Sequence, residues 1–338
     1  MSVQAELQKT IEDMVDDRRG LLAADESTPT ITKRFDAVGI ESTEETRRQY
    51  RSLLLSTEGI GECISGVILY EETLDQKDDS GRSIPELAEA QGVVPGIKVD
   101  KGKGPLPGAP GDEITYGLDG LAGRLREYRE KGARFTKWRE VYPITDHNPT
   151  RLGLTANAEM LARYTMVCQS EGFVPIVEPE VLIDGNHSMA RSAEVNEQVW
   201  HEVFHALHRH GASLEHLILK PSMVTPGKEQ GMPAPEEVAE ATIRVLRRAV
   251  PAAVPAIMFL SGGQTPEQAT ANLNAMNQVR ERCPWHLGFS YARALQEPVM
   301  QTWKGNPDNV QPAQDAFARR ARLNVAARQG EYNAGMEE

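Results

Sequence analysis

The segment FVPIVEPEVL, residues 173–182, begins with the apolar run FVPIV, and Glu178 and Glu180 follow this run. Its apolar residues follow one another without the polar alternation of a strand that has one face in water. A run of this composition is typical of a parallel strand whose sheet is covered by helices on both faces. The segment therefore predicts an α/β fold.

Seven more runs of this kind occur along the chain: GLLAADES near residue 20, ISGVILYEE near 64, VPGIKVDK near 94, RFTKWREVY near 134, HLILKPSMV near 216, AIMFLSGG near 256 and HLGFSYAR near 286. Helical patterns such as NAEMLARYTMVCQSEG and PEEVAEATIRVLRRAV separate them. Eight strand–helix units predict a (β/α)8 TIM barrel. We expect one domain over residues 1–338, with a barrel core over about 20–300, decorating helices at 5–17 and about 311–328, and a C-terminal helix and short tail over about 301–338.

Composition narrows the partners and the location. The net charge of −12 disfavours nucleic acid and anionic lipid as partners. No stretch approaches the roughly 18 consecutive apolar residues of a membrane span. The first residues, MSVQAELQKTIEDMVDDRRG, carry no apolar signal run, and three cysteines without C-x-x-C spacing predict unpaired thiols. Together these features predict a cytoplasmic protein.

The segment HEVFH, residues 201–205, matches the H-E-x-x-H pattern of zinc hydrolases. It lies between the fifth and sixth predicted strands, so its helix is expected on the outside of the barrel. At about 100° per residue, Val203 and Leu207 lie on the buried face of this helix. His201 and His205 point to solvent instead, so the pattern does not predict a metal site.

The segment LSGGQ, residues 260–264, resembles the signature of ABC-type ATPases. Those proteins also need a G-x-x-x-x-G-K-[ST] phosphate loop, and the sequence contains none. What remains is a glycine-rich turn directly after the seventh predicted strand. Barrels commonly bind phosphate at this place through backbone N–H groups.

Charged residues at the ends of these apolar strands are the most informative feature, because burying an unpaired charge costs on the order of several kcal/mol. Several form i, i+2 pairs, which point to the same side of a strand. The set is Asp25, Lys98, Asp100, Lys137, Arg139, Glu178, Glu180, Lys220 and Arg293. Any one pair could simply hold the barrel closed. The whole set predicts an active site at the C-terminal mouth of the barrel.

The predicted mouth combines lysines, arginines and carboxylates without clustered His or Cys, which favours covalent amine chemistry over metal chemistry. Lysine becomes a nucleophile where a neighbouring cation or an apolar site favours its neutral form. Lys220 follows the apolar run LIL. We expect it to face Lys137 across adjacent strands, with glutamates nearby for proton transfer, and we expect no cofactor and no metal.

The motifs at the strand ends resemble those of class I fructose-1,6-bisphosphate aldolase in order and spacing. They are LLAADEST, GIKVDKG, FTKWR, VPIVEPEVL, LILKPSMVTPG, FLSGGQ and FSYARALQ, and the resemblance extends from about Leu21 to Tyr332. It implies a phosphorylated sugar as substrate, namely fructose 1,6-bisphosphate, which is cleaved reversibly to dihydroxyacetone phosphate and glyceraldehyde 3-phosphate. It also implies a homotetramer.

The resemblance further implies roles for individual residues. Lys220 would form the Schiff base and Glu178 would act as general acid and base. Asp25, Lys137 and Glu180 would assist cleavage and orient the lysine. One phosphate site would comprise Ser261, Gly262, Gly263, Ser290 and Arg293, and the site for the other end of the sugar would comprise Ser27, Lys33, Arg34, Lys98 and Arg139.

Three positions depart from the family pattern. Pro29 and Thr30 stand where many relatives have Gly and Ser, so Pro29 offers no N–H to a phosphate. Ala292 stands where relatives often have Gly, and it would be strained at a positive φ. The tail GEYNAGMEE lacks the extension that ends in a tyrosine in animal and plant members. The role of that tyrosine is not assigned to Tyr332.

The residues leave two other functions open. One is a zinc-dependent hydrolase that uses HEVFH, and the other is a non-catalytic barrel scaffold. The charged mouth favours catalysis over a scaffold. The choice among fructose 1,6-bisphosphate, fructose 1-phosphate and sedoheptulose 1,7-bisphosphate also stays open, because loop shape decides it.

Overall fold

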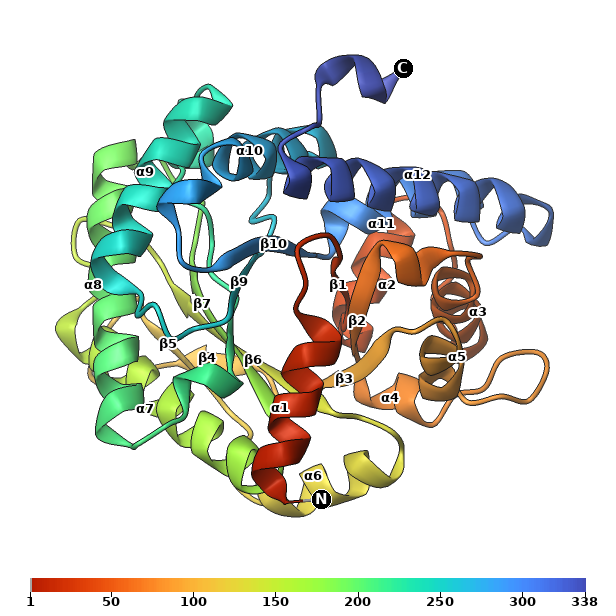
Figure 1. The fold of residues 1–338 in the computed structure, drawn as a ribbon, viewed down its shortest axis with the longest axis horizontal. Coiled ribbons are helices and arrows are strands. Elements are labelled where there is room, and N and C mark those ends of the chain that lie inside the picture. Colours follow the sequence, from red (N-terminus) through yellow and green to blue (C-terminus); the bar gives the residue numbers. More distant parts are fainter. Residues whose placement is uncertain (1) are drawn as a thin grey trace.

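Eight parallel strands close into a barrel in the computed structural model, which describes residues 2–338 (Figure 1). The strands are β1 (Gly20–Ala24), β2 (Ile64–Leu69), β3 (Val94–Lys98), β6 (Phe135–Tyr142), β7 (Val174–Val181), β8 (Ile218–Leu219), β9 (Ala256–Phe259) and β10 (His286–Tyr291). Their order around the barrel is β1-β10-β9-β8-β7-β6-β3-β2. Each barrel strand therefore pairs with the barrel strands that precede and follow it along the chain, and β10 pairs with β1 to close the barrel. The predicted (β/α)8 barrel is confirmed, and each of its strands lies in the run that predicted it.

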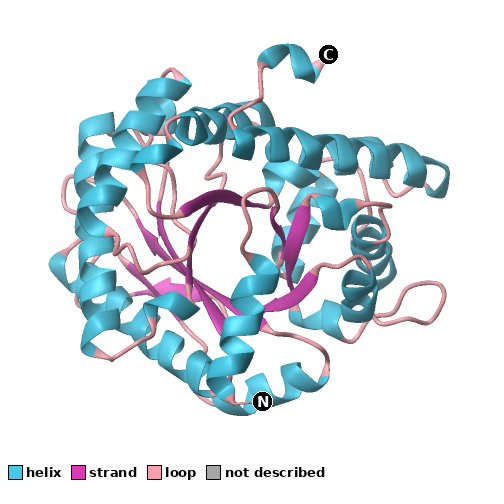
Figure 2. Ribbon diagram, viewed as in Figure 1, coloured by secondary structure: helices cyan, strands magenta, loops and turns pink. Residues whose placement is uncertain are grey.

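Helices surround the barrel on its outer face (Figure 2). They are α1 (Val3–Met14), α2 (Thr28–Asp36), α3 (Glu44–Leu55), α4 (Glu71–Leu74), α5 (Ile84–Ala90), α6 (Leu121–Glu130), α7 (Arg151–Ser170), α8 (Met189–Arg209), α9 (Pro235–Ala249), α10 (Pro266–Gln278), α11 (Arg293–Trp303) and α12 (Val310–Gln329). Capping boxes at Thr43, Ser83 and Thr265 fix where α3, α5 and α10 begin. Within residues 2–338, no helix has the length and apolar character to cross a membrane.

A short antiparallel hairpin lies in and just after the glycine- and proline-rich segment KGKGPLPGAPGDE, residues 101–113. Its strands are β4 (Lys103–Pro105) and β5 (Glu113–Thr115), and Lys103 pairs with Thr115. The hairpin follows β3 at the C-terminal end of the barrel, next to β6. It therefore contributes to the rim of the barrel mouth.

The predicted N-terminal helix closes the N-terminal end of the barrel. Leu7, Ile11 and Met14 of α1 join one apolar cluster with barrel residues such as Phe135 and Met258. Figure 1 shows α1 lying across the barrel opening. This apolar plug leaves the opposite end as the accessible mouth.

The Phe135 ring fills the barrel interior and requires glycine on the neighbouring strand β3. A Cβ atom added to Gly96 of β3 would lie 2.4 Å from carbon atoms of this ring. Such a contact is closer than the packing of a protein interior allows. The layer beneath the mouth is therefore tightly packed and apolar.

The HEVFH segment lies on α8, with the orientation that the sequence predicts. Val203 and Leu207 are buried, whereas His201 and His205 are exposed. Among residues 2–338, no group of three or more His, Cys, Asp or Glu side chains is arranged to hold a metal ion. The segment thus serves to pack α8 against the barrel.

We predict that Met14→Ala lowers the free energy of unfolding by about 2–5 kcal/mol, because it leaves a cavity beneath the barrel. Urea unfolding of the purified variant measures this loss. The neighbouring exposed residue gives the control, since Glu12→Ala should change the value by less than about 0.5 kcal/mol. If both variants changed stability equally little, α1 would not close the barrel.

Candidate functional site

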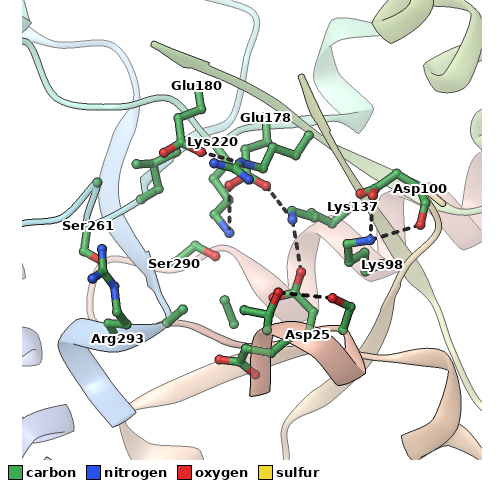
Figure 3. Close-up of a pocket in the computed structure, with 18 of the residues that line it drawn as sticks. Asp25, Lys98, Asp100, Lys137, Glu178, Glu180, Lys220, Ser261, Ser290 and Arg293 are labelled. Carbon is green, nitrogen blue, oxygen red and sulfur yellow. Dashed lines mark hydrogen bonds and ion pairs between the residues drawn. The ribbon is translucent and has the colours of Figure 1, made fainter. Parts of the chain in front are cut away.

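A cavity of about 350 Å³ opens among the C-terminal ends of the barrel strands. Figure 3 shows charged side chains from several strands pointing into it. The predicted residues that line it are Asp25, Ser27, Arg34, Lys98, Asp100, Lys137, Arg139, Glu178, Glu180, Lys220, Ser261, Gly262, Gly263, Ser290 and Arg293. Lys33 is the exception, because it is exposed on α2 and does not belong to the lining.

Lys137 lies at the centre of this charged group. Its Nζ is 3.0 Å from Asp25 Oδ2 and 2.9 Å from Glu178 Oε2, and all three side chains are buried. Burial alone would lower the pKa of Lys137, but the carboxylates of Asp25 and Glu178 raise it above its ordinary value. Lys137 is therefore a fixed ammonium group.

The contacts that raise the pKa of Lys137 lower the pKa of Asp25. Burial alone would raise the pKa of its carboxyl, but the ammonium groups of Lys137 and Lys220 lower it below its ordinary value. Asp25 follows β1 directly and is buried. It is therefore an ionised carboxylate that Lys137 holds at 3.0 Å.

Lys220 follows β8, and its Nζ lies 3.4 Å from Glu178 Oε1. The expectation that it faces Lys137 across adjacent strands is wrong, because β7 lies between β6 and β8. Glu178 of β7 occupies the position between the two lysines and contacts both. The intervening strand thus supplies a carboxylate that both amines share.

Two further ion pairs lie beside this centre. Lys98 Nζ lies 2.5 Å from Asp100 Oδ1, and Arg139 pairs with Glu180. Burial alone would lower the pKa of Arg139, whereas Glu180 raises it. The register places Arg139 opposite Glu178 on the neighbouring strand. The alternation of the strands thus brings the predicted i, i+2 residues to one face.

The glycine-rich turn after β9 forms another side of the cavity. Gly262 and Gly263 have φ values of 52° and 83°, which favour glycine. Ser290 of β10 is buried, and within residues 2–338 no hydrogen-bond partner exists for its Oγ. Arg293 begins α11 beside this turn, and its Nη2 would lie 3.7 Å from a Cβ at Gly263. Backbone amides, a buried hydroxyl and a guanidinium are suited to an anion.

Two departures from the family pattern fit the backbone in one respect, because neither residue needs a positive φ. Pro29 lies in the first turn of α2, where a backbone N–H has no partner within the helix. Ala292 has φ −100° and ψ −88°, so it needs no glycine. The loops at these positions therefore keep a backbone that the residues present can adopt.

The sequence reasoning missed several polar residues in and around the cavity. Glu26 lies in the lining, pairs with Arg34, and accepts a hydrogen bond from buried Arg51 at 2.8 Å. Lys103 and Thr115 line the cavity from the hairpin. The available signal for Glu26 was its position next to Asp25. The hairpin residues gave no signal, because their loop carries no strand pattern.

Comparisons with known proteins agree with this geometry. The family profile described as "Fructose-bisphosphate aldolase class-I" matches residues 6–338. The chain is 51% identical over 314 residues to "Fructose-bisphosphate aldolase 6, cytosolic" of Arabidopsis thaliana, covering 93% of this chain and 88% of that protein. It is 50% identical over 333 residues to "Fructose-bisphosphate aldolase 1, chloroplastic" of Chlamydomonas reinhardtii, covering 98% and 88%.

A solved structure gives the same result. It is the fructose-bisphosphate aldolase from Plasmodium falciparum in complex with TRAP and a small molecule inhibitor. The TM-score is 0.96 at 47% identity, and the match covers 98% of this chain and 96% of that chain. Sequence and fold thus point to one family.

We predict that Lys137→Met lowers the free energy of unfolding by about 3–5 kcal/mol, because it leaves buried carboxylates without their shared cation. Urea unfolding near neutral pH measures the loss. A matched control is Lys228→Met, which removes a lysine from an exposed pair with Asp184. Its effect should be much smaller, because water screens an exposed pair.

We further predict that the wild type and Lys137→Met differ in how the stability of the fold depends on pH. Because the folded-state pKa of Asp25 is lowered, its carboxylate stabilises the fold above the ordinary value of 3.8, and this stabilisation is lost as the pH falls below it. Lys137→Met removes the main cation, so its stability should fall less than that of the wild type between about pH 5 and 3. Parallel curves of stability against pH for the two proteins would contradict the assignment of Lys137 as the main cation that lowers the pKa of Asp25.

Proposed function

Because the chain belongs to the class I fructose-bisphosphate aldolase family, we propose that it cleaves fructose 1,6-bisphosphate reversibly through a Schiff base on Lys220. The products are dihydroxyacetone phosphate and glyceraldehyde 3-phosphate. One observation supports this choice of nucleophile above the others. Lys220 is the cavity lysine with the weakest contact to a carboxylate.

The other cavity lysines have closer partners. Lys137 contacts two carboxylates within 3.0 Å, Lys98 contacts Asp100 at 2.5 Å, and Lys103 pairs with Glu113. A close carboxylate stabilises the protonated amine, which cannot attack a carbonyl. Lys220, at 3.4 Å from Glu178, has the longest of these contacts. It is also buried at the base of the cavity, next to the apolar layer.

Glu178 is placed to move protons at the nucleophile. Its Oε1 lies near Lys220 Nζ, and its Oε2 contacts the permanently charged Lys137. In the proposed reaction, Lys220 attacks carbon 2 of the sugar and forms a carbinolamine. Glu178 takes the proton that Lys220 gives up on becoming a nucleophile and returns it to the carbon 2 hydroxyl, which leaves as water, and an iminium remains.

Asp25 is the proposed base for cleavage. It takes the proton of the carbon 4 hydroxyl, the bond between carbons 3 and 4 breaks, and its electrons pass to the iminium to give an enamine. Lys137 holds Asp25 in place at 3.0 Å. After glyceraldehyde 3-phosphate leaves, protonation of carbon 3 and hydrolysis of the iminium release dihydroxyacetone phosphate and regenerate Lys220. Glu180 orients Arg139 through their ion pair.

The distribution of cations favours a bisphosphate substrate over a monophosphate. Arg293 and the serine and glycine groups of the β9 turn form one anion site. Arg34, Lys98 and Arg139 lie in the lining contributed by α2, β3 and β6. Cations on different elements around the central lysine suit a ligand with charge at both ends. This arrangement supports fructose 1,6-bisphosphate ahead of fructose 1-phosphate.

Assembly, domain organisation and location complete the proposal. Family membership supports a homotetramer, and packing of both α1 and α12 against the barrel supports one folding unit over residues 1–338. A cytoplasmic location is supported by the cytosolic relatives and by Cys63 and Cys168, which are not in disulfides. Some relatives are chloroplastic.

We predict that borohydride reduction in the presence of dihydroxyacetone phosphate attaches one reduced triose phosphate to Lys220 and abolishes activity. Reduction converts the Schiff base into a stable amine, which peptide mass mapping locates. Lys220→Met should remain unlabelled. Retention of activity in a strong chelator, measured on the same preparation, distinguishes this chemistry from the zinc hydrolase.

Labelling at another lysine, or no labelling of an active enzyme, would refute the assignment of Lys220. Loss of activity on chelation with recovery on adding zinc would instead support the metal alternative. A folded protein without lyase activity would leave the scaffold as the remaining function.

The C-terminal tail packs against the outer helices and not over the mouth. Tyr332 is buried, its backbone N donates to Asn274 Oδ1 of α10 at 2.9 Å, and its hydroxyl donates to Glu337 at 2.8 Å. Arg320 of α12 donates to both Glu337 carboxylate oxygens, at 2.8 and 2.7 Å. Tyr332 does not belong to the cavity lining, which makes Glu178 the better candidate for protonating the enamine.

We therefore predict that truncation after Gln329 changes turnover by less than about tenfold, or about 1.4 kcal/mol in the barrier. Proton exchange on dihydroxyacetone phosphate should be similarly preserved. Thermal unfolding of the truncated protein checks that it remains folded, because removal of Tyr332 exposes the surface of α10. A loss of a hundredfold or more in a folded truncated enzyme would show that the tail takes part in catalysis.

A further inference from the structure

The β4–β5 hairpin contributes one cation to the cavity that the ends of the barrel strands do not supply. Lys103 lines the cavity from β4, and Thr115, which lies directly opposite it on β5, lines the cavity as well. Residues directly opposite each other in an antiparallel pair point to the same face. The face of the hairpin that carries Lys103 and Thr115 is therefore turned towards the cavity.

Hydrogen bonds hold this face of the hairpin against β6 (Figure 1). The Thr115 hydroxyl donates to the backbone O of Arg139 at 2.7 Å, and the Thr115 backbone N donates to Oε2 of the buried Glu140 at 3.1 Å. Trp138 Nε1 donates to the other oxygen of Glu140 at 2.8 Å. Lys103 is thus fixed on the side of the cavity to which Arg139 belongs.

The other cations on this side of the cavity pair with carboxylates that also line it. These pairs are Arg34 with Glu26, Lys98 with Asp100, and Arg139 with Glu180. Their three positive and three negative charges cancel. A phosphate that approaches this side therefore meets as many carboxylates as cations.

Lys103 differs from these cations in the place of its partner. It pairs with Glu113, and in the part of the chain that the structure describes Glu113 does not belong to the lining. The side chains of Lys103 and Glu113 are 39% and 33% exposed, so water screens their attraction. The flexible four-carbon stem of a lysine allows its ammonium group to change partners. Lys103 can therefore bring an uncompensated positive charge to the cavity.

Arg293 is the matching cation on the other side. It lines the cavity beside the glycine-rich turn, and within residues 2–338 it forms no ion pair. Arg293 follows β10, which lies opposite β6 in the strand order, with three strands between them in either direction. The cations that the lining leaves unbalanced thus lie on opposite sides of the mouth. A ligand with an anionic group at each end fits this distribution.

The position of Lys220 decides which end of the sugar reaches Lys103. In the proposed reaction carbon 2 binds Lys220, which follows β8, the strand next to β9. The phosphate on carbon 1 is close to carbon 2 and takes the turn after β9. The longer arm, carbons 3 to 6, extends to the opposite side, where the hairpin lies.

We propose that Lys103 is a specificity-determining residue that leaves Glu113 and binds the carbon 6 phosphate of the substrate. The proposal rests on the proposed function, which supplies the sugar bisphosphate. Fructose 1-phosphate has no phosphate on carbon 6, so Lys103 contributes nothing to its binding. The hairpin thus favours bisphosphates through a residue outside the barrel strands.

Steady-state kinetics with both sugars tests this role. Lys103→Met should raise the KM for fructose 1,6-bisphosphate by about threefold to tenfold, with little change in kcat or in the KM for fructose 1-phosphate. Lys103→Arg keeps the charge and should stay close to the wild type. Lys101→Met is the matched control, because Lys101 pairs with Glu71 and does not belong to the lining. It should change neither KM.

The exposed pair also has a simpler interpretation, in which it only holds the two strands of the hairpin together. Glu113→Gln separates the two interpretations, since it breaks the pair but leaves Lys103 free for the phosphate. The KM for fructose 1,6-bisphosphate should then stay the same or fall. Equal increases in Glu113→Gln and Lys103→Met would show that the pair is only structural and would overturn the proposal.

Calorimetric titration with hexitol 1,6-bisphosphate measures the contact without catalysis, because this polyol has no carbonyl for Lys220 to attack. Lys103→Met should bind it about threefold to tenfold more weakly than the wild type, and Lys101→Met equally well. Equal affinity of the wild type and Lys103→Met would overturn the proposal, as would equal increases in KM for both sugars. A wild type that cleaves neither sugar, but binds the hexitol through Lys103, would refute the proposed function and support the role of Lys103.

Discussion

The ion pairs of Lys137 with Asp25 and Glu178 are the interaction on which the cavity depends. Three charged side chains lie above an apolar layer, where each charge alone would cost several kcal/mol on the order expected for buried ions. Their mutual contacts at 3.0 and 2.9 Å make ionisation possible there. They also distinguish the two buried lysines. Lys137 lies between two carboxylates that raise its pKa, whereas Lys220 contacts only Glu178, at 3.4 Å.

The barrel explains why these charges meet at one end. Strand alternation sends Lys137 and Arg139 inward together, and parallel register places Arg139 beside Glu178. Below them Phe135 fills the interior and α1 covers the opposite opening. Charged side chains inside the barrel therefore contact water only at its C-terminal mouth. The same construction places a cavity lined mainly by charged and polar side chains directly above an apolar layer.

Local patterns predicted the strands and the charged mouth, because both depend on residues close together in sequence. The sequence could not predict how segments that are far apart in the chain are placed relative to one another. Lys137 and Lys220 were expected on adjacent strands, but the pairing order places β7 and Glu178 between them. Lys33 shares a motif with Arg34 yet points outward on α2, since helix phase separates neighbours. The hairpin has no apolar alternation, so its contribution to the cavity depends on tertiary contacts such as those of Thr115.

Asp25 and Glu140 show that burial alone does not decide the state of a carboxyl group in this protein. Both are buried, and burial by itself raises the pKa of each. Cations around Asp25 reverse the effect, whereas Glu140 has only neutral N–H donors and a repelling Asp100. Lys137 and Glu140 are three positions apart in β6, so Lys137 points towards the cavity and Glu140 away from it. Lys137 therefore cannot neutralise the carboxyl of Glu140. The two faces of one strand therefore carry different chemistry, with ion pairs on the side of the cavity and a buried carboxyl that accepts N–H hydrogen bonds on the side of the hairpin.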